Sequence, residues 1–356
     1  MKKGNIKGNS EIRIIDSISD DPWYNLAFEE YLLGQVQEGE VILYLWQNKD
    51  TVVIGRNQNA WKECPCQLLE DDGGKLARRL SGGGAVFHDL GNLNFTFVMD
   101  RNLYNLERQL QVILKAVRSM GVEAEFLGRN DLLAGGKKFS GNAFYFTDKA
   151  AYHHGTILLD SDFSKLVKYL QVSKEKIQSK GIDSVRSRVV NLKELNTDLT
   201  VTAMKKALKE SFIDNYSNIM VEELSNLASK SVDTSQMNEL RDLYDKYSSW
   251  EWRYGNSPHF DITYNERFDW GGIELCFTLK NGLVEDAVIY SDAMESELFR
   301  KLSKEFTGIP FRLEDFITSI DRTEVNIGES SDGESFRSQY KEILNDIRDC
   351  LKKRDW

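Results

Sequence analysis

The chain has 356 residues, of which 41% are apolar and 29% are charged, and its formal net charge is −10. This composition is typical of a soluble globular protein, and the length is sufficient for two domains. The acidic balance excludes a general nucleic-acid binder, and no apolar run approaches the roughly 18 residues of a membrane span. Four cysteines do not suggest a disulfide scaffold, and residues 1–10 lack the apolar centre of a signal peptide, so we expect a cytoplasmic protein.

The charge is distributed unevenly along the chain. Residues 261–356 carry a balance of −8, whereas residues 160–210 carry a balance of +4. The basic segment could face an acidic partner or an anionic ligand. A solvated surface with a chance imbalance is the alternative.

The N-terminal residues predict a strand, a helix and two further strands. Residues 11–15 read as a strand, and Asp21-Pro22 starts a helix, because aspartate is a good N-cap and proline suits the first helical position. Residues 41–46 and 51–55 are strand-like, and the polar loop 47–50 between them predicts a hairpin.

The middle of the chain predicts a helix and a set of strands. Apolar residues at helical spacing predict a helix over 103–117, with Gly121 as its stop signal. The pair Gly135-Gly136 suits a hairpin turn between two strands, and residues 151–159 read as another strand.

A boundary follows two further helical segments. Residues 248–258 contain aromatic anchors and then glycine and proline, which is typical of a domain border. Beyond it, Asn281-Gly282 predicts a hairpin between two alternating segments, and a terminal helix follows. We therefore divide the chain into residues 1–255 and a small α+β domain, residues 260–356.

One stretch combines arginines with a run of glycines. Arg78 and Arg79 precede Ser81-Gly82-Gly83-Gly84. Ordering three consecutive glycines is entropically costly, and the usual reason for it is close approach of the backbone to an anion held by N–H groups. Arginine suits phosphate or carboxylate. A surface turn with incidental charge is the alternative.

Lys138 and Asp131 flank the Gly-Gly turn. An ammonium group can hold a carboxylate and a phosphate together, although a surface lysine is the alternative. Because strand side chains alternate, Lys137 points to the opposite face, so only one of the two lysines belongs to a site. Asp131 is either a Mg²⁺ ligand beside phosphates or an Asx-turn residue.

Several other chemistries are excluded by the residue pattern. His153 and His154 are adjacent on an expected strand and cannot face one site, and Cys64-Pro65-Cys66 has no second pair for zinc. The chain also lacks the Gly-x-Ser-x-Gly elbow, the P-loop ending and the dinucleotide fingerprint.

Separated motifs occur together in one order: Asp21-Pro22-Trp23-Tyr24-Asn25-Leu26-Ala27, Thr51-Val52-Val53-Ile54-Gly55-Arg56, Trp61-Lys62-Glu63-Cys64, Arg78-Arg79-x-Ser81-Gly82-Gly83-Gly84-Ala85-Val86-Phe87-His88-Asp89, Gly128-Arg129-Asn130-Asp131, Lys138-x-Ser140-Gly141 and His153-His154-Gly155-Thr156. With them the chain closely resembles the two-domain bacterial lipoate–protein ligases, from about Ile14 to beyond Gly272. The resemblance implies an α/β (α+β) protein with the biotin/lipoate ligase catalytic fold, in which mixed sheets are flanked by helices. Residues 1–255 would be the catalytic domain and residues 260–356 the accessory domain.

The resemblance also implies the reaction. Lipoate and ATP, with Mg²⁺, would give lipoyl-adenylate, and the lipoyl group would then pass to a lysine of an acceptor domain. The implied partners are the lipoyl domains of 2-oxoacid dehydrogenase E2 subunits and the glycine cleavage H protein, with neither nucleic acid nor membrane involved.

The implied site residues follow motif by motif. The residues expected to hold ATP and the adenylate are Arg79, Gly84, Ala85, Val86, Phe87, Asp131 and Lys138. Those expected at the lipoyl group are Ser81, Gly82, Gly83, Lys138 and His154. Lys138 would act as an electrostatic catalyst rather than a covalent nucleophile, because fixed cations stabilise charge that develops between anionic partners. Tyr145 stands where some relatives carry an arginine, so one contact to the adenylate is in doubt.

Two hypotheses and two rival functions complete the sequence reading. We expect residues 174–188 to form a mobile cover over the adenylate, and an acidic acceptor to dock near the basic segment, at Lys174, Lys176 and Lys180. A cysteine-dependent acyltransferase of the same fold is one rival, although no cysteine is near Lys138 in the sequence. A non-catalytic lipoyl-domain binder is the other.

Overall fold

The computed structural model describes residues 11–127, 131–170, 188–216, 220–223, 234–254, 261–280, 282–328 and 334–354. The chain forms two compact units. Unit 1 consists of Met1–Val53, Lys62–Arg78 and Val86–Arg253, and unit 2 consists of Ile54–Trp61, Arg79–Ala85 and Tyr254–Trp356.

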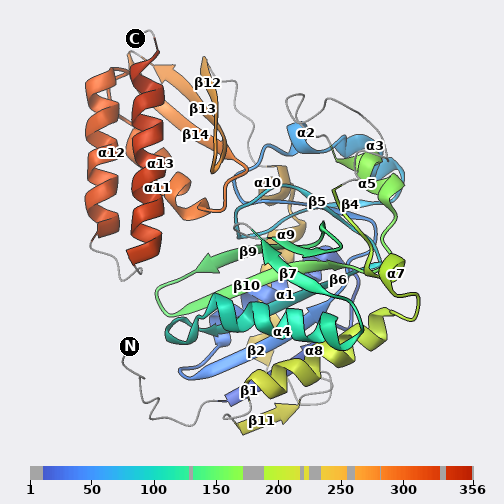
Figure 1. The fold of residues 1–356 in the computed structure, drawn as a ribbon. Coiled ribbons are helices and arrows are strands. Elements are labelled where there is room, and N and C mark those ends of the chain that lie inside the picture. The colour runs from blue at the N-terminus through green and yellow to red at the C-terminus, as the bar shows by residue number, and fades with distance from the viewer. Residues whose placement is uncertain are drawn as a thin grey trace. The chain divides into compact units, whose positions relative to one another are not determined.

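Unit 1 is built on a mixed sheet with eight described strands (Figure 1). In sheet order these are β11 (Met220–Glu223), β1 (Glu11–Asp16), β2 (Glu40–Trp46), β6 (Asn92–Asp100), β10 (Ala150–Leu158), β9 (Lys137–Phe146), β8 (Asp131–Ala134) and β7 (Ala124–Leu127). The pairs β1–β11 and β1–β2 are parallel, and the others are antiparallel. Strands β6 and β10 are central, which places their side chains between the layers on both faces.

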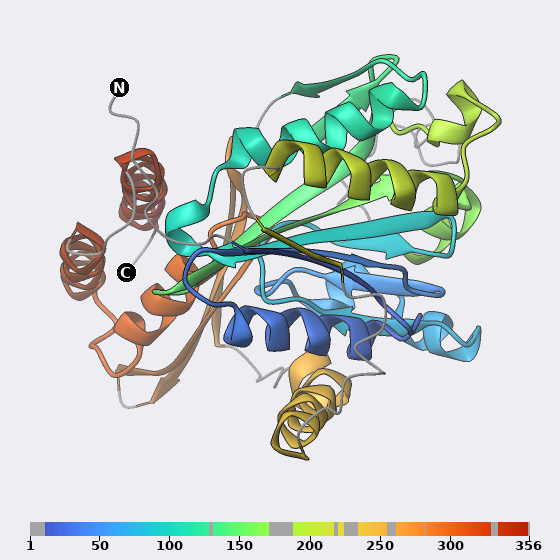
Figure 2. The ribbon, with the colours of Figure 1, turned by 90° about the horizontal axis from the view of Figure 1, so that it is seen from below.

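Helices cover both faces of this sheet (Figure 2). One face carries α4 (Leu106–Ser119) and α8 (Val201–Tyr216), and the other carries α1 (Pro22–Gln35), against which α9 (Thr234–Ser248) packs. Asp21 is the N-cap of α1, and its side chain accepts a hydrogen bond from the Trp23 N–H, as the sequence predicts. Unit 1 therefore has three layers, with helices on each side of the central sheet.

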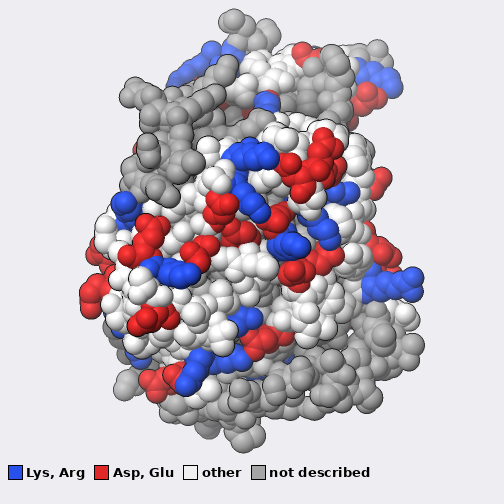
Figure 3. All heavy atoms as spheres, turned by 90° about the vertical axis from the view of Figure 1, so that its right-hand side faces the viewer, with Lys and Arg blue, Asp and Glu red and all other residues white. Residues whose placement is uncertain are grey.

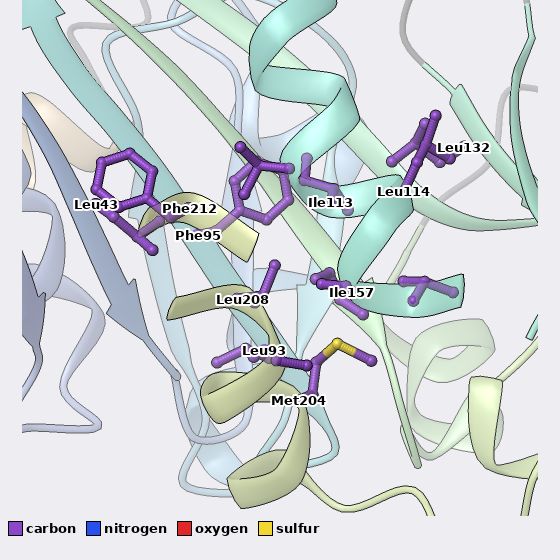
Figure 4. Close-up of a cluster of buried hydrophobic side chains, with 14 of the residues drawn as sticks. Leu43, Leu93, Phe95, Ile113, Leu114, Leu132, Ile157, Met204, Leu208 and Phe212 are labelled. Atoms are coloured by element: carbon purple, nitrogen blue, oxygen red, sulfur yellow. The ribbon is translucent and has the colours of Figure 1, made fainter. Parts of the chain in front are cut away.

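The main hydrophobic core lies between the sheet and the helices α4 and α8 (Figure 4). Leu93, Phe95 and Phe97 alternate along β6 and point into this core. Burial of such side chains stabilises the unit by about 2 kcal/mol each. The opposite face of β6 carries polar residues, and these form the site described below.

A second sheet in the described chain corrects one prediction. It has the order β4 (Lys75–Arg78), β3 (Thr51–Ile54) and β5 (Val86–His88). The predicted hairpin of residues 41–46 with 51–55 is therefore wrong, although both strands exist. Both edges of β2 are already bonded, to β1 and β6, so β3 pairs elsewhere.

Short helices connect these elements. They are α2 (Ala60–Glu63), α3 (Cys66–Asp71), the 3₁₀ helix η1 (Arg101–Leu103), α5 (Phe163–Tyr169), α7 (Leu192–Leu195) and α10 (Trp250–Tyr254).

The C-terminal part of unit 2 is a small α+β structure. Its sheet has the order β12 (Ile262–Phe268), β13 (Gly271–Lys280) and β14 (Leu283–Ser291), and its helices are α11 (Ser296–Phe306), α12 (Leu313–Gly328) and α13 (Glu334–Lys352). Gly282, at the turn between β13 and β14, has a positive φ of 75°, which glycine adopts without strain. A separate apolar cluster joins this sheet to the helices, so the mixed α/β fold with a small C-terminal α+β structure is confirmed.

Candidate functional site

The polar face of the large sheet is the side that carries Asn94, Thr96, His154, Thr156 and Lys138. The pairing register of the strands determines which residues lie on this face. Residues paired across two strands share a face, and the side chains of consecutive residues in a strand point to opposite faces. His154 pairs with Thr96, and Thr156 pairs with Asn94. Glu29 of α1 bonds to Thr96 on this side, whereas the alternate residues of β6 lie in the core. Polar groups in the middle of a buried sheet call for a functional explanation.

A β-bulge brings Lys138 onto the polar face. The pairing of β8 with β9 shifts by one residue between Leu132 and Leu133, which leaves Phe139 as an extra residue. Because the bulge reverses the alternation, Lys138 and Gly141 share one face. The Nζ of Lys138 lies 3.1 Å from the point that a Cβ on Gly141 would occupy. Glycine at position 141 therefore leaves room for this ammonium group.

Lys138 is held at both its backbone and its side chain. Its N–H donates to the Arg188 carbonyl at 2.9 Å, and its carbonyl accepts from the Val190 N–H at 3.0 Å. Its Nζ lies 2.7 Å from Oδ1 of Asp131, and the two side chains are 36% and 37% exposed. The sequence singled out these two residues separately, and the structure brings them together as an ion pair beside the Gly-Gly turn. The half-exposed ammonium can meet a ligand while staying anchored.

Among the described residues, Asp131 does not form a metal centre with other protein groups. Its carboxylate contacts Lys138, and the described residues contain no group of three or more His, Cys, Asp or Glu side chains that could hold a metal ion. Mg²⁺ keeps most of its waters and binds proteins through one or two carboxylates plus substrate phosphates. Asp131 therefore fits Mg²⁺ only as one ligand beside a bound nucleotide.

His154 is oriented by a chain of buried hydrogen bonds that the sequence did not predict. Glu29, which is 2% exposed, accepts from Nδ1 of His154 at 2.9 Å and from the Thr96 hydroxyl at 2.6 Å. The Thr96 hydroxyl in turn accepts from Nε1 of Trp46 at 2.9 Å. A carboxylate at Nδ1 fixes the proton there, so Nε2 is the ring atom directed away from Glu29.

His153 points to the opposite face, as the alternation predicts. Its ring bonds to the side-chain amides of Gln109 and Asn142, at 2.9 and 2.8 Å. Complete burial, together with the neighbouring His154, lowers the pKa of His153 well below its ordinary value of 6.5. His153 is therefore a neutral core residue.

Arg79, in unit 2, binds the glycine run itself. Its Nη2 donates to the carbonyls of Gly82 and Gly84 at 2.7 and 2.8 Å, and its Nε donates to the Ser81 hydroxyl at 3.0 Å. The guanidinium group is buried, so its contacts shape the loop from inside. Gly84 is exposed and Ala85 is half-buried, which makes this end the accessible part of the run.

Backbone contacts explain the first two glycines of the run. A Cβ on Gly82 would lie 2.4 Å from the carbonyl oxygens of Ala293 and Met294, and the Gly83 N–H donates to Ala293 at 2.8 Å. Gly83 also has a positive φ of 89°. The close approach expected for these glycines is thus to the chain's own backbone. A Cβ on Gly84 would meet nothing within 4 Å.

Val86 and Phe87 lie on β5, an edge strand of the small sheet among the described residues. The Phe87 side chain is buried and packs against Tyr169 with ring centroids 5.6 Å apart. The Phe87 side chain is therefore occupied by packing, which leaves its backbone as the part that could serve a ligand, whereas Val86 is only partly buried.

The predicted site residues thus fall into two groups. Unit 1 brings Lys138, Asp131 and His154 onto the polar face, whereas Arg79 and Ser81 to Ala85 belong to unit 2. Sequence reasoning missed four residues of the polar face, which are Glu29, Trp46, Asn94 and Thr96. A signal existed for two of them, because Asn92-Leu93-Asn94-Phe95-Thr96-Phe97 alternates polar and apolar residues inside a strong strand.

The four cysteines are free and buried. The hydrogen bond that the Cys64 thiol donates to the Cys66 sulfur, together with burial, raises the pKa of Cys64. A thiol held in its neutral form is a poor nucleophile, so Cys64 does not favour the cysteine-dependent rival, although the same hydrogen bond lowers the pKa of its neighbour Cys66.

The described lysines of the basic segment are largely paired with acids. Lys165 lies 2.7 Å from Asp50 and Lys168 lies 2.6 Å from Asp72. On the face drawn in Figure 3, the two signs of charge are likewise interspersed. Residues 174–187 of the expected cover, with the three lysines of the docking hypothesis, lie outside the described residues.

None of the helices in the described ranges is long and apolar enough to cross a membrane.

Comparison with known proteins identifies two family matches. Residues 21–213 match the lipoyl protein ligase A/B catalytic domain, and residues 257–336 match the bacterial lipoate protein ligase C-terminus. Lipoate-protein ligase A of Blochmanniella floridana is 39% identical over 307 residues, which cover 84% of this chain and 89% of that protein.

Solved structures with the same fold agree. LipL1 of P. falciparum in complex with lipoate is 29% identical and has a TM-score of 0.79, covering 96% of this chain and all of that one. A bipartite lipoate protein ligase with its E2 lipoyl domain, from Thermoplasma acidophilum, is 26% identical with a TM-score of 0.60, covering 71% and 99%. Lipoate-protein ligase A bound with ATP is 25% identical with a TM-score of 0.58, covering 70% and 99%. The resemblance seen in the sequence motifs is confirmed, and the chain belongs to the lipoyl protein ligase A/B family.

Proposed function

We propose that this chain catalyses the ATP-dependent ligation of lipoate to a lysine of an acceptor protein, in two half-reactions. In the first, a lipoate carboxylate oxygen attacks the α-phosphorus of ATP, and the bond to pyrophosphate breaks. In the second, the acceptor amine attacks the carbonyl carbon of lipoyl-adenylate, and AMP leaves with the bonding electron pair. ATP-dependent lipoate ligation is the activity of the family to which the chain belongs.

The observation that carries this proposal is the position of Lys138. Its ammonium group is fixed by a bulge, by two backbone hydrogen bonds and by Asp131, on the same face as His154. A positive charge at that point stabilises negative charge shared between carboxylate and phosphate, and later the oxyanion at the lipoyl carbonyl. Truncating one such donor typically costs about 3–4 kcal/mol of transition-state stabilisation.

The remaining roles are proposed on the resemblance. Arg79 supports the loop whose residues Gly84, Ala85, Val86 and Phe87 hold ATP and the adenylate through their backbone. Ser81, Gly82 and Gly83 bend beside the lipoyl group, and His154 lines its pocket. The exposure of Gly84 and the edge position of β5 support the nucleotide assignment. Asp131 would contribute one carboxylate to Mg²⁺ held on the ATP phosphates, where the ion would neutralise phosphate charge.

The acceptors we propose are lipoyl domains, specifically those of 2-oxoacid dehydrogenase E2 subunits and the glycine cleavage H protein. The similar Thermoplasma acidophilum ligase, described with its E2 lipoyl domain, supports lipoyl acceptor domains in general. A cytoplasmic location and the division into a catalytic domain, residues 1–255, and an accessory domain, residues 260–356, belong to the same proposal.

The test compares Lys138→Ala with Lys137→Ala. The control lysine lies on the same strand but on the opposite face. We expect lipoate-dependent pyrophosphate release to fall about 10²- to 10³-fold in Lys138→Ala and to stay near wild type in Lys137→Ala. Mass spectrometry of a lipoyl domain incubated with ATP and lipoate should show the added lipoyl group only where pyrophosphate release persists. Equal activity of the two variants would contradict the assignment.

A further inference from the structure

The polar face of β6 contains two buried asparagines whose hydrogen bonding is incomplete. Asn92 and Asn94 are 0% and 1% exposed. Nδ2 of Asn92 donates to Oδ1 of Asn94 at 2.9 Å. Nδ2 of Asn94 and Oδ1 of Asn92 are then buried without a hydrogen-bond partner among the described residues. An unsatisfied buried polar group of this kind destabilises the fold, so its retention calls for a reason.

The shortfall does not depend on how the amides are oriented. Reversing both groups exchanges nitrogen for oxygen in the bond between them and still leaves one polar atom of each residue unpaired. The unpaired donor belongs to Asn94 in the orientation described, in which Asn92 donates to Asn94, and would belong to Asn92 in the reversed one. The next polar residue on the face behaves differently, because the hydroxyl of Thr96 both accepts from Trp46 and donates to Glu29. The incomplete bonding of the asparagine pair therefore does not extend to Thr96.

Register places Asn94 in one row with the catalytic lysine. Asn94 pairs with Thr156 of β10, and the Gly141 N–H of β9 donates to the Thr156 hydroxyl at 3.2 Å. The ammonium group of Lys138 lies beside Gly141. Because neighbouring strands are about 4.8 Å apart, Asn94 lies about 10 Å across the sheet from Gly141. An eight-carbon acyl chain whose carbonyl is held by Lys138 has a comparable length.

We infer that Asn94 is a specificity-determining residue that selects the sulfur-bearing end of lipoate over the plain alkyl end of octanoate. The inference rests on the proposed function, in which Lys138 holds the carbonyl end. Sulfur is a weak hydrogen-bond acceptor, so the dithiolane ring gives the Asn94 N–H group a partner, whereas a methyl or methylene group does not. A site built to form a hydrogen bond discriminates against the analogue that leaves it unpaired.

The neighbouring side chains fit this assignment. Trp46 of β2 pairs with Asn94 of the neighbouring strand β6 and is 3% exposed. Its indole nitrogen already donates a hydrogen bond to the Thr96 hydroxyl. Its ring therefore supplies apolar surface beside the asparagine. A mostly apolar pocket with one placed donor is the usual form of a selective small-molecule site.

The experiment measures kcat/KM for lipoate and for octanoate, as acid-dependent pyrophosphate release by the full-length chain at saturating ATP. The variants are Asn94→Leu, which keeps the size of the side chain, and Asn94→Ser, which is smaller and easier to accommodate. We expect wild type to have the higher kcat/KM with lipoate. Both variants should lower the ratio of kcat/KM for lipoate to kcat/KM for octanoate about tenfold, chiefly because kcat/KM for lipoate falls. If Asn94 had a purely structural role, its replacement would lower kcat/KM equally for both acids.

Three results separate the inference from the function on which it rests. No acid-dependent pyrophosphate release by wild type would overturn the proposed function. Equal kcat/KM of wild type for the two acids would overturn the inference alone, even if neither variant folded. An unchanged ratio in a folded variant would also overturn it, and would indicate that the asparagine pair serves only an internal water.

Discussion

The glycine run of unit 2 and the polar face of unit 1 use their polar groups in opposite ways. In the glycine run, Arg79 is bonded to Ser81, Gly82 and Gly84, and the Gly83 N–H is bonded to Ala293. On the polar face, the buried Nδ2 of Asn94 has no hydrogen-bond partner among the described residues, and Lys138 keeps a half-exposed ammonium group. The stretch with the more conspicuous sequence therefore satisfies most of its own polar groups.

This difference shows that a glycine-rich motif does not by itself locate ligand contacts. Gly82 and Gly83 are needed because the backbone of residues 293–294 approaches them, whereas Gly84 faces open space. The residues that we propose to recognise an acyl group lie on strands whose sequence is unremarkable in composition. Three changes test the contrast, beginning with the largest expected loss of stability.

Replacing Gly82 by alanine should disrupt the glycine run, whereas replacing Gly84 should not. A Cβ at Gly82 would lie 2.4 Å from two backbone carbonyl oxygens, which cannot rotate away, so we expect unfolding free energy to fall by about 3 kcal/mol. Gly84→Ala meets nothing within 4 Å and should change stability by less than about 0.5 kcal/mol. Urea denaturation followed by circular dichroism measures both.

The same pair of variants tests the proposed nucleotide contact. If the backbone at position 84 holds ATP, Gly84→Ala should raise the KM for ATP while leaving stability intact. Equal stability losses in the two variants would show that the backbone approach at Gly82 does not distinguish the two glycines.

On the polar face, Glu29→Leu should cost stability and misorient His154. The change leaves the Nδ1–H of His154 and the Thr96 hydroxyl without their buried acceptor, for which we expect a loss of about 2 kcal/mol and a higher KM for lipoate. Glu29→Gln retains an acceptor oxygen, so its stability and its KM for lipoate should both stay close to the wild-type values. The measurements are urea denaturation and lipoate-dependent pyrophosphate release.

The neighbouring Glu30 provides the matched control for this change. It is 24% exposed and pairs with Lys246 at 2.6 Å, so Glu30→Leu should cost less than about 1 kcal/mol and leave the KM for lipoate unchanged. A Glu29→Leu variant with the wild-type KM would remove Glu29 from the role of positioning His154.

The fold class was implied by the resemblance of the separated motifs to a known family. The helices α1 and α4 and the hairpin around Gly135-Gly136 were predicted from the residues themselves, because periodicity, capping and turn chemistry are local properties. The sequence failed on the β2–β3 pairing, which depends on which strand edges other elements already occupy. The opposite orientation of Lys137 and Lys138 was predictable from alternation. The bulge at Phe139 was not, since a single extra residue leaves no pattern in composition or spacing.

The smallest effect concerns pH and the core residue His153, which lies on the opposite side of β10 from the site. Its pKa is lowered well below 6.5 in the folded chain by burial, with a smaller contribution from His154, so the unfolded chain binds the extra proton first as the pH falls. The contribution of His153 to the free energy of unfolding is therefore constant well above pH 6.5. It decreases as the pH falls below 6.5, and the loss reaches about 1.4 kcal/mol at pH 5.5. Unfolding free energy measured at pH 7.5 and 5.5 should therefore drop by about this amount more in wild type than in His153→Gln. The same drop in both proteins would mean that another group carries the acid sensitivity, and that the neutral state of His153 does not limit stability.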